Sequence, residues 1–314
     1  MLRNGPMMRV VVTGGTGFIG KKLVAALLAR GYLVTVLTRD VEGTQGRIDA
    51  RARIAGWTPW ARGVWAEEVD GVDAVIHLAG AGVFDEAWSK DRVEVLRWSR
   101  VETTRELSLA IASARRPPKV LVSTSAVGIY GMRTDDEVLT EDAEKGTDVL
   151  AEICKAWEKA AAPAVDAGVR VVHPRLGVVL GAEGGALAKM LPAFKLRMGG
   201  PLGQGTQWVS WVHWRDVVDA FDFALTTAEV KGPYNVTAPN PARMQDLAEA
   251  IALVLNTHAK ARVPRFALEL ILGKERAEVL LTGQRASSKK LEDAGFGFSY
   301  ADLVPALEEL IGPK

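Results

Sequence analysis

Cysteine is almost absent from the sequence, since Cys154 is the only one among 314 residues. A single thiol cannot form an intramolecular disulfide, and by itself it cannot build a thiolate metal site. We therefore assign no metal site. A chain without disulfides suits a reducing compartment, and we expect a cytoplasmic protein.

An excess of charge and a long apolar run are also missing. The 39 basic side chains balance the 38 acidic ones, which leaves no basic stripe for a phosphate backbone and argues against a nucleic-acid partner. No run reaches the roughly 18 apolar residues of a membrane span. The start of the chain has no apolar stretch of the export type, so we expect no membrane partner. Residues 1–7 are treated as a short extension with no assigned role.

The first forty residues read as a strand, a tight turn, a helix and a second strand. Residues 8–13 (MRVVVT) are a short run rich in β-branched residues, and residues 14–20 (GGTGFIG) follow. Residues 21–31 (KKLVAALLARG) have helical periodicity and end in glycine, and residues 32–39 (YLVTVLTR) form another apolar strand. Such a βαβ unit is the context in which a glycine-rich turn binds a dinucleotide.

The glycines of this turn have the spacing G-x-x-G-x-x-G at Gly14, Gly17 and Gly20, with Gly15 added. Glycine lets the backbone turn tightly and approach a pyrophosphate, which then accepts hydrogen bonds from the first N–H groups of the helix. The alternative is that these glycines only shape the turn. The residues expected to bind a cofactor here are Gly14, Gly15, Thr16, Gly17, Phe18, Ile19 and Gly20.

The end of the second strand distinguishes NADP(H) from NAD(H), because NAD sites place a carboxylate there and NADP sites a cation. Thr38 and Arg39 occupy this position. Arg39 can pair with a 2′-phosphate through two hydrogen bonds, and Thr38 can donate a third. Asp40 could instead bind the ribose, and a solvated Arg39–Asp40 pair is a third reading. NADP(H) is favoured, and NAD(H) remains the alternative.

Two later segments read as strands that end at the same sheet edge. Residues 73–79 (DAVIHLA) form a buried strand, and we expect Leu78, Ala79 and Gly80 to approach the cofactor. His77 is more typical of a satisfied core histidine than of a ligand. After a predicted helix over about 89–115, KVLVSTSA ends in a polar group whose Ser123 is a further cofactor candidate.

These segments resemble the extended short-chain dehydrogenase/reductase superfamily, through VTGGTGFIG, VIHLAG and STSAVGIYG. PRLGVVLG, LGGPLG, WVHWRDVVDA and GQRASSKKLEDAGFGF resemble an atypical, bacterial epimerase-family subgroup with a characteristic C-terminal extension. The resemblance implies an α/β fold, with a Rossmann doubly wound parallel sheet over residues 1–174. The chain would return to this domain around 208–236, and residues 175–314 would mostly form a smaller α+β capping lobe. Pro174 would then lie beside the nicotinamide.

The superfamily's catalytic tyrosine and lysine, four residues apart on the helix after the serine strand, are missing. Alignment on Glu158 places Leu150 and Cys154 at these positions. Lys155 comes one residue late, which turns its side chain by about 100°. Lys155 either reaches the ribose through a rotated helix or is a solvated lysine.

Three residues are left as catalytic candidates: Ser125, Tyr130 and Lys155. The resemblance makes Ser125 the serine that polarises the substrate oxygen, although one extra residue separates it from the loop tyrosine. Tyr130 is a proton donor or an aromatic that packs the loop. Arg175 meets an anionic substrate or braces the lobe, and His213 is more typical of a structural residue than of an acid or base.

A strand near residues 169–172 is expected to end at Pro174, and the second half of the chain is expected to form the cap. Trp208, Trp211 and Trp214 recur every third residue and indicate an aromatic wall. Residues 243–256 and 264–282 read as amphipathic helices, and the segment from 289 onward reads as a terminal element on the cap.

The function we expect is that of an NADP(H)-dependent oxidoreductase or epimerase acting on a small hydroxyl- or carbonyl-bearing molecule. The family resemblance implies a nucleotide sugar as one such substrate, and a homodimer as one arrangement of its chains. The alternative is an NADP(H)-binding sensor or regulatory module that has lost turnover with its tyrosine and lysine.

Overall fold

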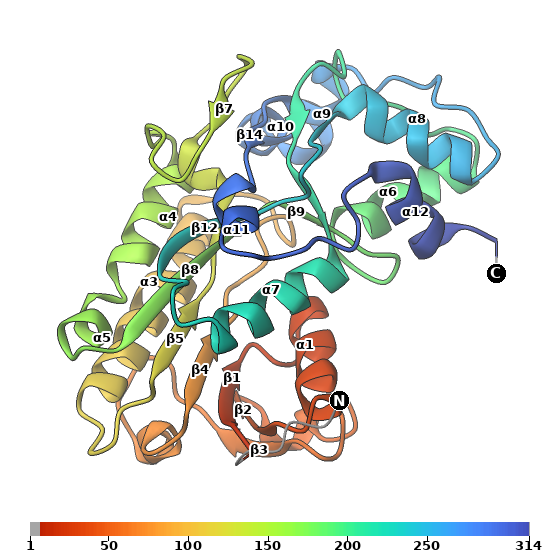
Figure 1. The fold of residues 1–314 in the computed structure, drawn as a ribbon. Coiled ribbons are helices and arrows are strands. Elements are labelled where there is room, and N and C mark those ends of the chain that lie inside the picture. The colour runs from red at the N-terminus through yellow and green to blue at the C-terminus, as the bar shows by residue number, and fades with distance from the viewer. Residues whose placement is uncertain (1–6, 314) are drawn as a thin grey trace.

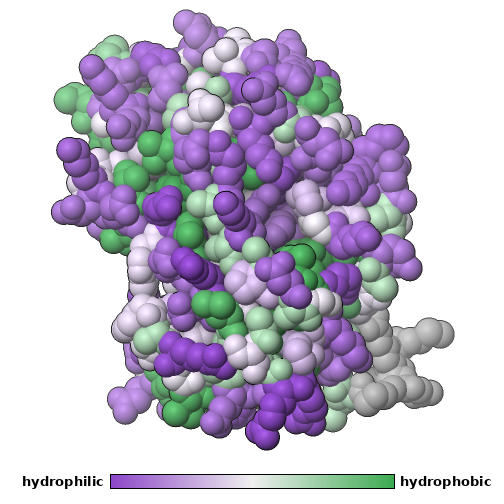
Figure 2. All heavy atoms as spheres, turned by 90° about the vertical axis from the view of Figure 1, so that its left-hand side faces the viewer, coloured by the Kyte–Doolittle hydropathy of each residue, from purple (hydrophilic) through white to green (hydrophobic). Residues whose placement is uncertain are grey.

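The structure is a computed structural model that describes residues 7–313. A parallel sheet lies between two layers of helices, and a smaller lobe sits over the carboxyl ends of the strands (Figure 1). This is the predicted doubly wound α/β fold with a cap. Within residues 7–313, no helix is both long and apolar enough to cross a bilayer, and hydrophilic side chains cover much of the face in Figure 2.

The described residues form a sheet of eight strands in the order β3–β2–β1–β4–β5–β8–β12, with the short β6 paired to β8 beyond the end of β5. From β1 the chain adds strands in one direction as far as β3, and from β4 it adds them in the opposite direction as far as β12. The strand order therefore reverses between β1 and β4, and this reversal opens a crevice at the carboxyl ends of the strands. The strands are β1 (Arg9–Thr13), β2 (Leu33–Thr38), β3 (Arg53–Gly56), β4 (Ala74–His77), β5 (Val120–Ser123), β6 (Ser125–Ala126), β8 (Arg170–Leu176) and β12 (Gly232–Val236).

Two groups of helices cover the two faces of this sheet (Figure 1). On one face α3 packs against α4 and α5, and on the other α1 packs against α7. The long α3 begins at its N-cap Ser89, whose side chain accepts a hydrogen bond from Arg92 N. The elements are α1 (Phe18–Ala29), α2 (Val41–Thr44), α3 (Lys90–Ala112), α4 (Val149–Lys159), α5 (Ala162–Asp166) and α7 (Trp214–Thr226), with 3₁₀ turns at Val64–Val69 and Val127–Tyr130.

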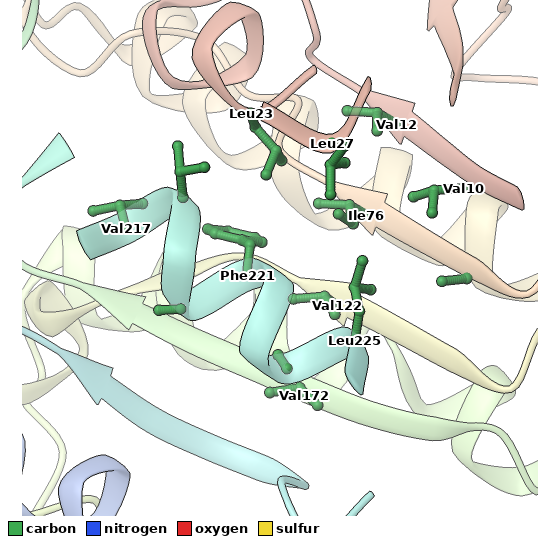
Figure 3. Close-up of a cluster of buried hydrophobic side chains, with 14 of the residues drawn as sticks. Val10, Val12, Leu23, Leu27, Ile76, Val122, Val172, Val217, Phe221 and Leu225 are labelled. Carbon is green, nitrogen blue, oxygen red and sulfur yellow. The ribbon is translucent and has the colours of Figure 1, made fainter. Parts of the chain in front are cut away.

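The core between α1, α7 and the sheet is made of aliphatic side chains around Phe221 (Figure 3). Val217, Phe221 and Leu225 recur every fourth residue and so lie on one face of α7. Leu23 and Leu27 of α1 face them in the same cluster. In the sequence, α7 follows α6, which belongs to the second lobe. The core of the nucleotide-binding domain is therefore completed only when the chain returns to this domain.

The second lobe has its own core, contributed mainly by α6, α8 and α12. Leu187, Leu247 and Leu307 are fully buried there. The elements of this half and of its connections are β7 (Val138–Leu139), β9 (Val178–Leu180), α6 (Gly185–Lys195), β10 (Trp208–Val209), β11 (Trp211–His213), β13 (Ala242–Arg243), α8 (Met244–Val254), α9 (Arg265–Leu272), α10 (Lys274–Leu281), β14 (Arg285–Ala286), α11 (Lys289–Asp293) and α12 (Leu303–Ile311).

Three expectations about element boundaries were wrong. The segment 264–282 is two helices, because Gly273 at φ +82° separates α9 from α10. The strand expected to end at Pro174 continues to Leu176, since β6 and β12 pair with its last residues. The segment from 289 onward is divided between two cores: Leu291 and Phe296 pack with the sheet, whereas α12 packs in the cap.

Replacement of Phe221 tests the core beneath α7. Because the side chain is fully buried, we expect Phe221→Ala to lower the free energy of unfolding by about 3–5 kcal/mol. Phe266→Ala is the matched control, since Phe266 is 72% exposed and should change stability by less than about 0.5 kcal/mol. Urea denaturation measures both, and equal losses would contradict this description of the core.

Candidate functional site

The glycine-rich turn connects β1 to α1 at the crevice in the sheet. Gly14 has φ +70°, and a Cβ there would lie 2.7 Å from the carbonyl carbon of Leu78, directly after β4. A Cβ on Gly20 would lie 2.1 Å from Gly14 O. Both positions therefore need glycine, which brings the turn, the start of α1 and the residues 78–80 close together.

The first turn of α1 has no side chain that would compete with an anion for its backbone N–H groups. Its N-cap is Gly17, which supplies no side-chain oxygen, and the first turn contains no acidic residue. The first N–H groups of a helix have no partner within it, so they are available to a phosphate at the positive end of the helix. The Phe18 ring packs against Gly181 and Gly184, where any Cβ would collide with it.

The end of β2 separates the roles of Arg39 and Asp40. Thr38 is the last residue of the strand, and its hydroxyl lies 2.9 Å from Thr44 Oγ1. Asp40 caps α2 by accepting a hydrogen bond of 2.8 Å from Gly43 N. Arg39 is exposed. The carboxylate of Asp40 is thus engaged by the next helix, whereas Arg39 makes no side-chain hydrogen bond or ion pair with the described residues 7–313.

His77 is a core histidine. It is fully buried at the end of β4, and its Nδ1 lies 2.6 Å from Thr13 Oγ1. Burial lowers the pKa of His77 to about 3, which keeps the ring neutral.

The two serines at the end of β5 are both withdrawn from solvent. The Ser123 hydroxyl is buried without a hydrogen-bond partner among residues 7–313, and its carbonyl lies 3.2 Å from His173 Nδ1. Ser125 is 1% exposed and donates a hydrogen bond of 2.7 Å to Glu158 Oε1. Pro174, the other candidate at this edge, is buried within β8 opposite Tyr234.

Arg175 is the centre of a buried polar network. Its Nε and Nη2 donate to the two carboxylate oxygens of Glu158 at 2.8 and 3.0 Å. Its Nη1 donates to Tyr130 Oη at 2.9 Å and to Glu141 O at 2.8 Å. Tyr130 in turn donates to Asn235 Oδ1 at 2.7 Å. Arg175 therefore braces the structure and is not free to meet an anionic substrate.

The network also changes the proton affinities of its members. Burial acts to raise the pKa of Glu158, but the hydrogen bonds and charge of Arg175 hold that pKa below its usual range. Burial raises the pKa of Tyr130 to about 12. A phenol with that pKa, whose proton already binds Asn235, is poorly suited to exchange protons with a substrate.

The three catalytic candidates therefore do not converge on one reacting point. Ser125 and Tyr130 meet in the Arg175 network, and neither lies among the residues that line the cavity described next. Lys155 forms an ion pair with Glu152 on the outer side of α4.

A cavity of about 600 Å³ lies between the carboxyl ends of the strands and the cap. Its wall on the sheet side includes residues 126–128, Leu150 and residues 176–178. The remaining wall is mostly aliphatic, aromatic and sulfur-containing: Val83, Phe84, Met132, Met190, Phe194, Met198, Leu202, Trp208, Val209, Met244, Leu247, Val263, Leu268, Leu272, Val279 and Leu280. Leu150, at the position of the superfamily tyrosine, thus presents an apolar side chain to this space.

Arg100 is a residue that the sequence did not single out. Its guanidinium lies over the Trp157 ring at 5.3 Å and donates to Ala81 O at 2.9 Å. Burial lowers the pKa of Arg100, and the buried thiol of Cys154 lies within its electrostatic reach. Cys154 stands where the superfamily lysine falls, so Arg100 brings a cation from α3 to that same neighbourhood. Nothing in the spacing of α3 distinguishes this arginine from its neighbours.

The predicted aromatic wall was wrong in its membership. Trp208 lines the cavity, but Trp211 is fully buried and donates to Asn240 O, and Trp214 lies under the ammonium of Lys22. His213 is structural, because its Nε2 lies 3.0 Å from Glu309 and its Nδ1 caps α7.

The fold and the turn at its crevice define a dinucleotide-binding protein of the extended short-chain dehydrogenase/reductase class. Residues 10–237 match the NAD dependent epimerase/dehydratase family, and residues 263–310 match a domain of unknown function, DUF1731. The chain belongs to the NAD dependent epimerase/dehydratase family, which confirms the resemblance seen in its motifs.

Relatives match over nearly the whole chain. An Arabidopsis thaliana protein, the chloroplastic homolog of epimerase family protein SDR39U1, is 39% identical over 97% of this chain and 87% of its own length. Epimerase family protein YfhF of Bacillus subtilis is 36% identical over 98% and 99% of the two chains. The crystal structure of human SDR39U1 with NADPH superposes with a TM-score of 0.87 and 32% identity, covering 96% of this chain and 99% of that one.

Removal of the buried carboxylate tests the Arg175 network. We expect Glu158→Gln to cost about 3–5 kcal/mol of stability, because it leaves Arg175 uncompensated. Glu152→Gln, six residues earlier on α4 and 57% exposed, should cost less than about 0.5 kcal/mol. The pKa of Glu158 is lower in the folded protein than in the unfolded chain. Its carboxylate therefore contributes fully to the free energy of unfolding when the pH is above the unfolded-state pKa of about 4.3. The difference between wild type and Glu158→Gln in urea melts should therefore shrink as the pH falls below that value, and a constant difference would contradict the assignment.

Proposed function

We propose that this protein binds NADP(H) at the glycine-rich turn and transfers hydride to or from a small hydroxyl- or carbonyl-bearing molecule held in the apolar cavity. The observation that carries the proposal is the cavity of about 600 Å³, whose wall includes the residues that follow β6 and β8. In a doubly wound sheet, ligands bind at this carboxyl edge.

The residues present fit a dinucleotide. The uncapped first turn of α1 would hold the pyrophosphate, and the backbone of residues 78–80 lies against Gly14. Arg39 would pair with the 2′-phosphate, because Asp40 is engaged in capping α2. The NADPH found with the human relative supports this choice of cofactor.

When bound, the nicotinamide supplies or accepts a hydride at its C4 carbon. Arg100 would take the part of the missing lysine and place a positive charge beside the nicotinamide ribose. The apolar side chains around the cavity would exclude bulk water and orient an apolar substrate. For a carbonyl substrate, the carbon gains the hydride and the oxygen gains a proton. We assign that proton to a bound water, because Tyr130 is held in the Arg175 network.

The apolar wall argues against a nucleotide sugar. A sugar and a diphosphate carry many hydroxyls and two negative charges, each of which would need a partner once withdrawn from water. Most of the wall has no polar atom in its side chains. An aldehyde, ketone or alcohol with a mostly apolar body fits it better.

The second candidate function is an NADP(H) sensor without turnover. It is favoured by the closed state of Ser125 and Tyr130, whose hydroxyl protons are already donated within the protein. A sensor would bind the cofactor as well as an enzyme does but would have no use for the cavity.

The cofactor assignment is tested at Arg39. We expect Arg39→Ala to weaken NADPH binding by about 1–3 kcal/mol, roughly 5–150-fold, through the loss of a charge-assisted pair, with NADH binding unchanged. Tryptophan fluorescence titration measures both. Asp40→Asn is the control, since asparagine keeps the helix cap. A loss of NADH affinity in Asp40→Asn, with Arg39→Ala unaffected, would instead assign the ribose to Asp40.

Turnover is tested by filling the cavity. Purified protein with NADPH should reduce members of a panel of apolar aldehydes and ketones, followed at 340 nm. We expect Met190→Trp, whose larger side chain would occupy the cavity, to reduce kcat/KM at least tenfold while NADPH binding is unchanged. Leu196→Trp, at a 67% exposed position just after α6, should behave as wild type. Cofactor binding without turnover of any substrate would favour the sensor.

A further inference from the structure

One buried cation in the cavity wall has no counter-ion. Arg276 of α10 is 8% exposed, and its Nε is buried without a hydrogen-bond partner. Its Nη2 makes one weak hydrogen bond, 3.3 Å to Phe84 O, and the guanidinium lies 5.8 Å from the centre of the Phe84 ring. Within residues 7–313, no carboxylate lies within 4.0 Å of its guanidinium nitrogens. A desolvated guanidinium this poorly satisfied is costly to the apoprotein unless something else binds it.

The other buried polar side chains in the wall already make hydrogen bonds within the protein. Gln207 donates to Leu202 O and Leu280 O. Ser210 donates to Gln284 O and accepts from Ala286 N. In the same way, Asp148 accepts from Met132 N and caps α4, Thr282 donates to Glu278 O, and Gln284 donates to Gly131 O. Arg276 is therefore the buried group of this wall that is left to bind a polar part of a ligand.

Lys189 is the only other cation among the residues lining this cavity. Its side chain is 62% exposed, and its Nζ lies 3.8 Å from Asp85. A solvated ammonium that faces a carboxylate contributes little to binding an anion. The fixed positive charge of the cavity is thus that of Arg276, in a wall made mostly of aliphatic, aromatic and methionine side chains.

We propose that the ligand of this cavity is an amphipathic carboxylate, whose anionic end binds Arg276 and whose apolar body fills the space toward Leu150. This names the substrate class and so rests on the proposed function. A guanidinium matches a carboxylate with two parallel hydrogen bonds. A phosphate monoester would bring a charge of about −1.5 to −2, and the cavity holds one buried cation to meet it.

The test compares ligands that share a chain and differ in the head group. Decanoate, 1-decanol and decyl phosphate are titrated into the purified full-length chain by calorimetry, first without cofactor and then with NADPH. We expect decanoate to bind at least tenfold more tightly than decanol and more tightly than decyl phosphate. Arg276→Gln should abolish the preference for decanoate over decanol, and Arg276→Lys should restore part of it.

Lys274→Gln is the matched control, because it removes a positive charge from an exposed position two residues earlier on α10. It should keep the preference, as should Lys189→Gln. Equal binding of decanoate and decanol by the wild-type protein would overturn the proposal without recourse to any variant. So would a preference that survives in Arg276→Gln or is lost in Lys189→Gln, and tighter binding of decyl phosphate would replace the carboxylate by a phosphate.

The binding assay needs no turnover, so its outcome is separable from that of the proposed function. A carboxylate preference that depends on Arg276, in a protein that reduces no carbonyl compound, would leave the ligand class standing and remove the catalysis. If neutral aldehydes are reduced with the same kcat/KM by wild type and Arg276→Gln, and no carboxylate preference is found, the catalysis would stand and the ligand class would be removed.

Discussion

The ion pair between Arg175 and Glu158 is the interaction on which the rest of the site depends. It joins β8 to α4, and through Tyr130 and Asn235 it extends to the loop after β6 and to β12. A buried guanidinium is tolerated because two carboxylate oxygens, a phenol and a carbonyl satisfy it. Since these groups come from segments far apart in the sequence, the network fixes the carboxyl ends of β6, β8 and β12 relative to α4.

That network also engages the two hydroxyl side chains that the sequence shares with the superfamily motif. Ser125 and Tyr130 are present in the motif, yet both are hydrogen-bonded into the brace around Arg175 and Glu158. The positions of the missing tyrosine and lysine carry Leu150, which faces the cavity, and the buried Cys154. Of these two positions, that of the tyrosine lies in the cavity wall, and Leu150 makes this part of the wall apolar.

The sequence predicts the sheet and the turn well, because both follow from local patterns. β-branched runs mark β1, β2 and β4, and the glycine spacing marks a turn in which a Cβ on Gly14 or Gly20 would collide with backbone. The cap was harder. The three tryptophans share a spacing but lie on β10, on β11 and at the start of α7, and only Trp208 reaches the cavity. Arg100 and Arg276 carry no local signal, since burial and lack of a counter-ion arise only from tertiary contacts.

Arg276, which is buried, and Arg100, which is half-buried, have different surroundings. Arg100 is held by the carbonyls of Leu96 and Ala81 and by the Trp157 ring, so it is positioned before any ligand arrives, as its proposed place beside the cofactor ribose requires. Arg276 has one weak hydrogen bond to Phe84 O, so a ligand would gain the full strength of its interaction. A substrate that brings its own negative charge would relieve the desolvation of Arg276, and its affinity would report on the cavity rather than on the cofactor.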